Sequence, residues 1–142
     1  MACTDLNYKY IGFDLNVKSV ESNQKMAEFL GKRLLLKPEI YQNDSSFCDF
    51  PSADLLFTSP PYDSTERYFG IDSSKTKTEP ILDNIFKKFN GIVALNVPKR
   101  MRDLTVAIGQ RHSWRLSEEL QMKTSSFMGR EKTFEPILIF RK

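Results

Sequence analysis

The sequence has little cysteine and no long apolar run, and each shortage excludes a class of protein. Its two cysteines, Cys3 and Cys48, are too far apart to indicate a disulfide framework or a zinc site. No apolar segment approaches the roughly 20 residues of a membrane span. The N-terminus lacks the basic start and apolar run of a signal peptide. We expect one domain, residues 1–142, in the reducing cytoplasm, with no membrane partner and no metal.

Charge gives only a weak indication of a partner. The 21 Lys and Arg residues exceed the 18 Asp and Glu residues, for a net charge of +3. A mildly basic chain is compatible with nucleic acid but does not require it. Basic side chains gather in the last third of the sequence. A phosphate-binding surface would explain them, and so would a solvated helix face with an exposed tail.

Apolar segments of strand length alternate with amphipathic segments of helix length. Strands are expected at residues 8–13, 40–42, 53–58, 91–97, 116–123 and 136–140, and helices at 17–30, 80–89 and 99–110. This alternation predicts an α/β sandwich with a mostly parallel sheet. The last two strands have no helix between them, which predicts a terminal antiparallel hairpin at the sheet edge.

Individual residues sharpen this prediction. Asn16 is a suitable N-cap for the first helix. The segment 53–58 is nearly continuous in apolar residues, which is typical of a strand buried on both faces. The helix at 99–110 should be amphipathic through Met101, Leu104 and Ile108. Trp114 is expected in the core.

Polar residues follow three of the predicted strands. Asp14 and Asp44 each come at or just after a strand, and the tetrapeptide 59–62 follows the strand at 53–58. In open α/β sheets, ligands bind at the carboxyl ends of the strands. Taken singly, an aspartate there is usually a turn or cap residue, and a Pro-Pro pair is usually a rigid loop. Together the three features predict one cleft.

The same three features resemble motifs of a known family. In order, they are Gly12-Phe13-Asp14, Asn43-Asp44 and Thr58-Ser59-Pro60-Pro61-Tyr62. They resemble the S-adenosylmethionine-dependent amino-methyltransferases that modify N4 of cytosine or N6 of adenine in DNA. Residues 134–140 resemble the last strand of that family. The resemblance implies a three-layer Rossmann-like methyltransferase sandwich, S-adenosylmethionine as cofactor and DNA as partner.

The resemblance also implies the residues that bind the cofactor. Asp14 would accept hydrogen bonds from the ribose hydroxyls, as acidic residues do in nucleotide-binding folds. Leu15 would pack on the adenine, and Asp44 would accept from the adenine amino group. Ser59 belongs to this set as well as to the catalytic one.

The catalytic set implied by the resemblance is Ser59, Pro60, Pro61 and Tyr62. The lone pair of an exocyclic base amine is delocalised into the ring, so the amine is a poor nucleophile. Acceptors at the Ser59 oxygen and the Pro60 carbonyl would favour a tetrahedral nitrogen that attacks the sulfonium methyl. Prolines fix φ and therefore preset the direction of that carbonyl. Tyr62 would stack on a base flipped out of the duplex. Serine at the first position favours cytosine N4 over adenine N6.

The sequence departs from the family at its front end. It contains no Gly-x-Gly and no Gly-rich turn before Tyr8, and seven residues are too few for the family's first strand and helix. In the family that strand lies between the second and fourth strands. Its absence should leave unpaired edges or force those two strands together. We therefore expect a rearranged sheet, or a second chain or homodimer partner that completes it.

Only two segments, 63–78 and 125–134, are long enough as loops to contact DNA. The residues that we select there as nucleic-acid contacts are Arg67, Tyr68, Phe127 and Arg130. Ordinary exposed loops are the simpler explanation. His112 stands near a helix end, where a surface or capping role is expected rather than catalysis.

Three functions remain open from the sequence. The first is a DNA amino-methyltransferase module that is a fragment or one half of a split enzyme, inactive alone. The second is a non-catalytic nucleic-acid-binding or interaction subunit that keeps the fold. The third keeps the chemistry but modifies RNA or a protein side-chain amide, since the tetrapeptide recognises only a planar amine.

Overall fold

The computed structural model describes residues 8–31, 36–61, 77–123 and 134–142, and the structural statements below refer to these residues. Along the chain the elements are β1 (Ile11–Asp14), α2 (Val17–Gly31), β2 (Glu39–Gln42), β3 (Leu55–Thr58), α3 (Thr78–Lys88), β4 (Ile92–Asn96), the 3-10 turn η3 (Lys99–Met101), α4 (Arg102–Arg111), β5 (Arg115–Lys123) and β6 (Phe134–Arg141). Each predicted strand and helix is present, with its bounds shifted by at most a few residues. The α/β class is confirmed.

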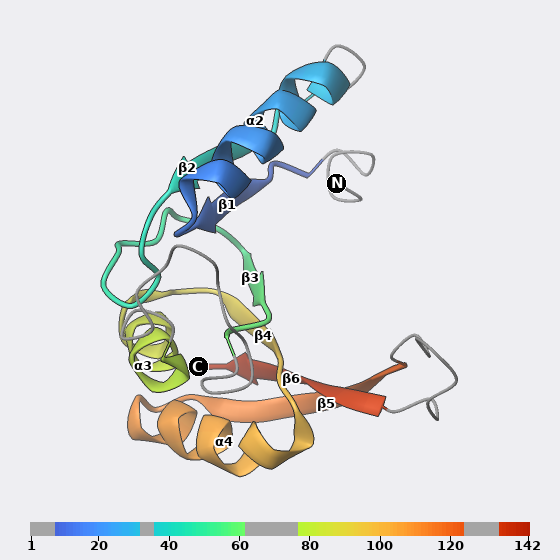
Figure 1. The fold of residues 1–142 in the computed structure, drawn as a ribbon. Coiled ribbons are helices and arrows are strands. Elements are labelled where there is room, and N and C mark those ends of the chain that lie inside the picture. The colour runs from blue at the N-terminus through green and yellow to red at the C-terminus, as the bar shows by residue number, and fades with distance from the viewer. Residues whose placement is uncertain (1–7, 32–35, 62–76, 124–133) are drawn as a thin grey trace.

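The strands form two sheets (Figure 1). In the small sheet β1 pairs with β2 in parallel. In the large sheet the order is β3-β4-β6-β5, with β3 parallel to β4 and β6 antiparallel to both its neighbours. The predicted terminal hairpin is therefore present as β5 and β6. Among the described strands, β1 and β3 are not paired with each other, so the division between the two sheets falls between these strands.

Helices α3 and α4 pack together beside the large sheet and enclose the main core (Figure 1). The apolar stripe predicted for α3 is buried there, with Leu82, Ile85 and Phe86 each no more than 1% exposed. Trp114 is also in this core, as predicted. Its indole Nε1 donates a 2.8 Å hydrogen bond to the carbonyl of Phe86, whose ring meets the Phe140 ring edge to face. Burial of these aromatic residues stabilises this part of the fold.

The prediction that segment 53–58 is buried on both faces is wrong. Leu56 packs against the main core, but Leu55 and Phe57 are 55% and 60% exposed. Successive side chains of a strand point to opposite faces. The main core therefore covers one face of β3, and no described residue buries these two side chains on the other.

The prediction for helix 99–110 is also partly wrong. The segment begins as η3 and becomes α-helical only at Arg102. Met101 and Ile108 are buried, but Leu104 is 41% exposed and Thr105 takes the inner position. Thr105 can be buried because its hydroxyl donates a 2.8 Å hydrogen bond to the carbonyl of Met101, the last residue of η3.

Helix α2 covers the small sheet (Figure 1). Asn16 caps it as predicted, since its side-chain oxygen accepts from the Lys18 N–H at 3.0 Å. Val20 and Ala27 are buried on its inner face. No helix in the described part of the chain is both long and apolar enough to cross a membrane.

His112 joins the two core helices. It follows α4, and its Nε2 lies 2.8 Å from Asp83 Oδ1 on α3. The predicted capping position is confirmed, because the His112 N–H donates back to the last turn of α4. The hydrogen bond from His112 lowers the pKa of Asp83 below its ordinary value of 3.8.

This ion pair predicts a pH dependence of stability. A carboxylate with a lowered pKa in the folded state stabilises the protein above its unfolded pKa, and this contribution disappears as the pH falls through the folded pKa. Wild type should therefore exceed Asp83→Asn in free energy of unfolding by under about 1 kcal/mol at pH 5, because the pair is half exposed. The difference should vanish as the pH is lowered below about 3.

Urea titrations monitored by circular dichroism at several pH values measure this difference. The exposed Asp54→Asn variant is the matched control for loss of one carboxylate. A difference between wild type and Asp83→Asn that grows towards low pH would contradict the assignment.

Candidate active site

Asp14 ends β1 and begins the turn into α2. Its Oδ1 accepts the N–H of Asn16 at 2.8 Å, and its carbonyl accepts the N–H of Asn43 at 3.1 Å. The second bond connects the end of β1 with the residue just beyond β2. The side chain of Asp14 thus has a structural role through one oxygen, and no described residue is hydrogen-bonded to its other carboxylate oxygen.

Asp44 organises a tight turn after β2. It is only 6% exposed, and its Oδ1 accepts from the N–H of Ser46 at 2.9 Å and from the Ser46 hydroxyl at 2.6 Å. Its carbonyl accepts the N–H groups of Phe47 and Cys48 at 3.3 and 3.0 Å. The ordinary explanation of an aspartate in this position, a turn residue, therefore holds for Asp44 and for Asp14.

Helix α3 holds this turn in place. The buried Asn84 donates from Nδ2 to the carbonyls of Ser45 and Cys48 at 3.1 and 2.9 Å. One turn further along, the Lys88 ammonium donates to the Phe47 carbonyl at 2.8 Å. The position of Asp44 is thus set by a helix that is distant in sequence.

The same helix anchors the proline pair. The Thr78 hydroxyl, in the first turn of α3, donates to the carbonyl of Pro61. Thr78 and Asn84 are separated by six positions, which is about 9 Å along a helix axis. Helix α3 therefore holds both the Asp44 turn and the residues after β3, through side chains nearly two turns apart.

The tetrapeptide is described as far as Pro61. Ser59 is exposed, Pro60 is buried and Pro61 is half-buried, so the first residue faces solvent directly after β3. Tyr62 lies outside the described residues. So do the four predicted nucleic-acid contacts, Arg67, Tyr68, Phe127 and Arg130.

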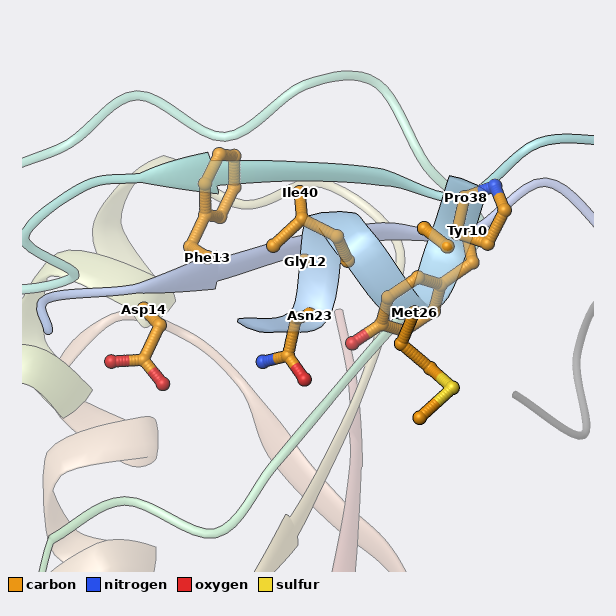
Figure 2. A pocket seen from close by; sticks show the side chains of 9 residues that line it. Tyr10, Gly12, Phe13, Asp14, Asn23, Met26, Pro38 and Ile40 are labelled. Carbon is orange, nitrogen blue, oxygen red and sulfur yellow. The ribbon is translucent and has the colours of Figure 1, made fainter. Parts of the chain in front are cut away.

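A cavity of about 250 Å³ lies between β1 and α2. Asp14 stands at one end of it, and Tyr10 and Pro38 stand at the other. Figure 2 shows the side chains of Asp14, Asn23 and Met26 pointing to the same side of β1. Of the predicted cofactor residues, Asp14 lines this cavity, whereas Leu15, Asp44 and Ser59 do not.

Sequence reasoning missed the residues that support the site. Asn84 and Thr78 lie on the buried side of α3, and both use their side chains to hold loops. Asn84 interrupts the apolar stripe of the helix, and a polar residue in such a stripe must find a hydrogen-bond partner when it is buried. That interruption was the available signal. Asn23 and Tyr10 carry no comparable signal.

The remaining nucleophile near this cluster is poorly reactive. Cys48 is 5% exposed, and burial raises the pKa of its thiol, which disfavours the thiolate. Among the described residues no three histidine, cysteine or acidic side chains gather as metal ligands would. The polar groups that the described residues of this region present are carboxylate, hydroxyl and carbonyl oxygens, which can accept hydrogen bonds.

The sequence and the structure were compared with those of known proteins. No protein-family model matches the sequence, and no curated protein matches it either. Solved structures do match. A methyltransferase from Methanosarcina mazei, described as dependent on S-adenosylmethionine, aligns with a TM-score of 0.70 at 12% identity, over 99% of this chain and 85% of its own.

Two other solved enzymes show the same similarity. Magnesium protoporphyrin IX methyltransferase from Synechocystis, solved with bound S-adenosylmethionine, aligns with a TM-score of 0.69 at 11% identity over 98% of this chain. The tRNA (uracil-54, C5)-methyltransferase of Pyrococcus abyssi, solved with S-adenosylhomocysteine, gives 0.65 at 12% over 99%. The chain spans 62% of the former and 30% of the latter. These alignments show that the chain has the Rossmann-like α/β fold that these methyltransferases share.

Proposed function

We propose that this chain is the cofactor-binding and amine-holding module of an S-adenosylmethionine-dependent amino-methyltransferase that acts on DNA, with N4 of cytosine as the favoured target. One observation carries the proposal. Asp14 ends β1, the Asp44 turn follows β2 and Pro61 follows β3, and the three are connected through the Asn43 amide and helix α3. Ligands bind at this edge of open α/β sheets.

The described residues fit a nucleoside cofactor. Asp14 uses Oδ1 for its own turn, and its second oxygen adjoins the cavity beside β1, where it can accept ribose hydroxyls. Asp44 is held by Ser46 through Oδ1 only, which leaves Oδ2 to accept an adenine amino group. Leu15, next to Asp14, supplies apolar surface for the adenine ring. When bound, the cofactor supplies an electrophilic methyl on a sulfonium.

The residues after β3 fit the target amine. Ser59 is exposed at the end of the strand and can accept one amine hydrogen, and the Pro60 carbonyl can accept another. Because the Thr78 hydroxyl binds the next carbonyl, that of Pro61, the loop is fixed before any substrate arrives. Acceptors fixed in this way stabilise the charge that develops on nitrogen as it attacks. Tyr62 completes the proposal as the group that stacks on the base.

A transfer assay with radiolabelled S-adenosylmethionine tests the proposal. With the chain in excess over a mixed-sequence DNA duplex, and with a second polypeptide that supplies the family's first strand and Gly-rich turn, label should appear in N4-methylcytosine. Ser59→Ala should lower the rate by about a hundredfold, the usual effect of removing one preorganised polar group. The exposed Ser52→Ala is the matched control and should leave the rate unchanged.

The same assay with other substrates distinguishes the DNA methyltransferase from the RNA, protein-amide and non-catalytic alternatives. One structural neighbour is named as a tRNA methyltransferase, so transfer RNA is assayed beside DNA, together with a glutamine-containing peptide. Label in RNA or peptide but not in DNA would replace the proposed substrate. A chain that binds DNA with steep salt dependence, but binds no cofactor and transfers no methyl, would be the non-catalytic subunit instead.

A further inference from the structure

We propose that Lys99, in η3, and Lys123, at the end of β5, bind the sugar-phosphate backbone of the DNA strand whose base reaches Ser59. The choice of DNA rests on the proposed function, whereas the choice of these two side chains rests on charge, exposure and strand register. The basic residues of the last third of the chain then fall into two groups, one that binds phosphate and one that is used within the fold.

Most of these basic side chains are already engaged within the chain. Arg102 forms ion pairs with Asp103 and Glu119 at 3.0 and 2.8 Å. The other engaged groups are Arg111 with Glu79, Arg141 with Glu118, and Lys142 with the Trp114 ring and the Phe89 carbonyl. Lys99 and Lys123 are exposed, and no described carboxylate forms an ion pair with either of them. Their charges are therefore available to phosphate groups.

Lys99 lies close to the proposed position of the target base. Strands β3 and β4 are parallel, with Thr58 beside Leu95. Ser59 therefore lies beside Asn96, the last residue of β4. Lys99 comes three residues later, and three residues extend at most about 11 Å. The end of β4 thus brings Lys99 to the same edge of the sheet as Ser59.

Lys123 stands on a two-stranded ribbon that extends past the end of β4. Strand β4 last pairs with β6 at Asn96, whereas β5 and β6 stay paired as far as Lys123 and Phe134. Figure 1 shows β5 and β6 extending beyond the end of α4. The root of the ribbon is fixed, because the Pro136 carbonyl accepts the Val97 N–H at 3.2 Å and the Asn96 side-chain amide at 3.3 Å. Lys123 is therefore held at the edge of the sheet that also carries the end of β4.

The ribbon and η3 lie on the same face of the large sheet. Arg102, which directly follows η3, donates a 2.8 Å hydrogen bond to Glu119 of β5. Lys123 stands four residues after Glu119, so the alternation of a strand places both side chains on one face. Glu135 pairs one position before Lys123 on the ribbon and lies on the opposite face.

The charge on this face favours a polyanion. Its basic side chains, which outnumber the acidic Asp103 and Glu119, are Lys99, Arg100, Arg102 and Lys123. A solvated helix face does not explain the pattern, since Lys123 belongs to a strand. DNA carries phosphates at regular intervals, so a backbone bound at one lysine presents further phosphates towards the other.

Salt-dependent DNA binding tests the contact on the intact chain without cofactor. The probe is a fluorescein-labelled, mixed-sequence DNA duplex of about 20 base pairs, followed by fluorescence anisotropy, and each phosphate contact contributes about 0.9 to the slope of log K against log salt. Lys99→Ala and Lys123→Ala should each lower the slope by that amount. Between about 1 M and about 0.1 M salt this is a factor of about eight in affinity, and about sixty for the double variant.

Two further variants are the controls. Arg115 is exposed and basic and has no ion pair to a described carboxylate, but it pairs with Arg141 at the opposite end of β5. Arg115→Ala should therefore leave the slope unchanged. Lys99→Arg keeps the positive charge and should bind as wild type does. Circular dichroism establishes that each variant is folded.

Two results would overturn the contact itself. One is a wild-type slope in both lysine variants, which would leave Lys99 and Lys123 as solvated surface groups. The other is an equal decrease in Arg115→Ala, which would mean that DNA binds without preference for this edge. Tighter binding of an RNA duplex of the same sequence would overturn the assignment to DNA.

The binding measurement and the methyl-transfer assay can fail independently. Transfer of label to DNA with unchanged slopes in both lysine variants would keep the proposed function and refute the phosphate contacts. Lowered slopes in a chain that binds no S-adenosylhomocysteine would refute the proposed function and keep the phosphate contacts.

Discussion

Replacing Trp114 with alanine should lower the free energy of unfolding by about 3–5 kcal/mol, the usual cost of truncating a large buried aromatic residue. Trp114 is 2% exposed and touches the Phe86 ring at a centroid distance of 5.7 Å. Its removal leaves a cavity between α3 and β5 and also leaves the Phe86 carbonyl without its indole donor. Because small domains are stable by only about 5–15 kcal/mol, much of the fold's stability would be lost.

Two controls divide this effect into its parts. Trp114→Phe keeps an aromatic ring but loses the donor, so it should cost about 1–3 kcal/mol, the penalty for a buried acceptor left without a partner. Phe134→Ala removes an aromatic residue that is 48% exposed and should cost under about 0.5 kcal/mol. Urea denaturation followed by circular dichroism measures all three. A loss of less than about 1 kcal/mol in Trp114→Ala would show that the packing around the indole is not as described.

Asp14→Ala should weaken the binding of S-adenosylhomocysteine by about a hundredfold. The proposed contacts are hydrogen bonds from two ribose hydroxyls to a carboxylate, each worth about 1.5–3 kcal/mol. Losing about 3 kcal/mol corresponds to a factor of about 100 in the dissociation constant. Isothermal titration calorimetry with wild type and variant measures the change directly.

Asp14→Asn separates binding from the structural role of the same side chain. An asparagine oxygen can still accept the N–H of Asn16, which Asp14 accepts at 2.8 Å, so the turn should persist and the unfolding free energy should hardly change. Without the negative charge, binding should weaken by about tenfold, because bonds to neutral acceptors are roughly half as strong. Affinity equal to wild type in both variants would remove Asp14 from the site.

The order and type of the elements could be predicted because they depend on local patterns. The stripe of Leu82, Ile85 and Phe86 on α3 follows helical spacing. The Asn16 cap depends only on an asparagine side chain that accepts the backbone N–H two residues later. Exposure could not be predicted in the same way. Leu55 and Phe57 are apolar whether or not another element covers them. Their pattern therefore predicted burial, but both side chains are more than half exposed in the described chain.

The candidate site was predictable only in part for a similar reason. The positions of Asp14, Asp44 and Ser59 after successive strands follow from chain order, and the structure places them there. The support from Asn84 and Thr78 depends on contacts that span 36 and 17 positions of sequence. A single sequence does not reveal which distant carbonyl a buried amide or hydroxyl will reach.

The division of the sheet has a consequence for the cooperativity of unfolding. The unit β1-α2-β2 and the unit built on the large sheet share no strand pairing, and the bonds from Asn84 and Lys88 to residues 45–49 are what holds the turn after β2 on α3. The small unit can therefore open at a lower free energy than the global transition, as separate cooperative units do. A ligand held by Asp14 in one unit and Ser59 in the other would couple the two openings into one.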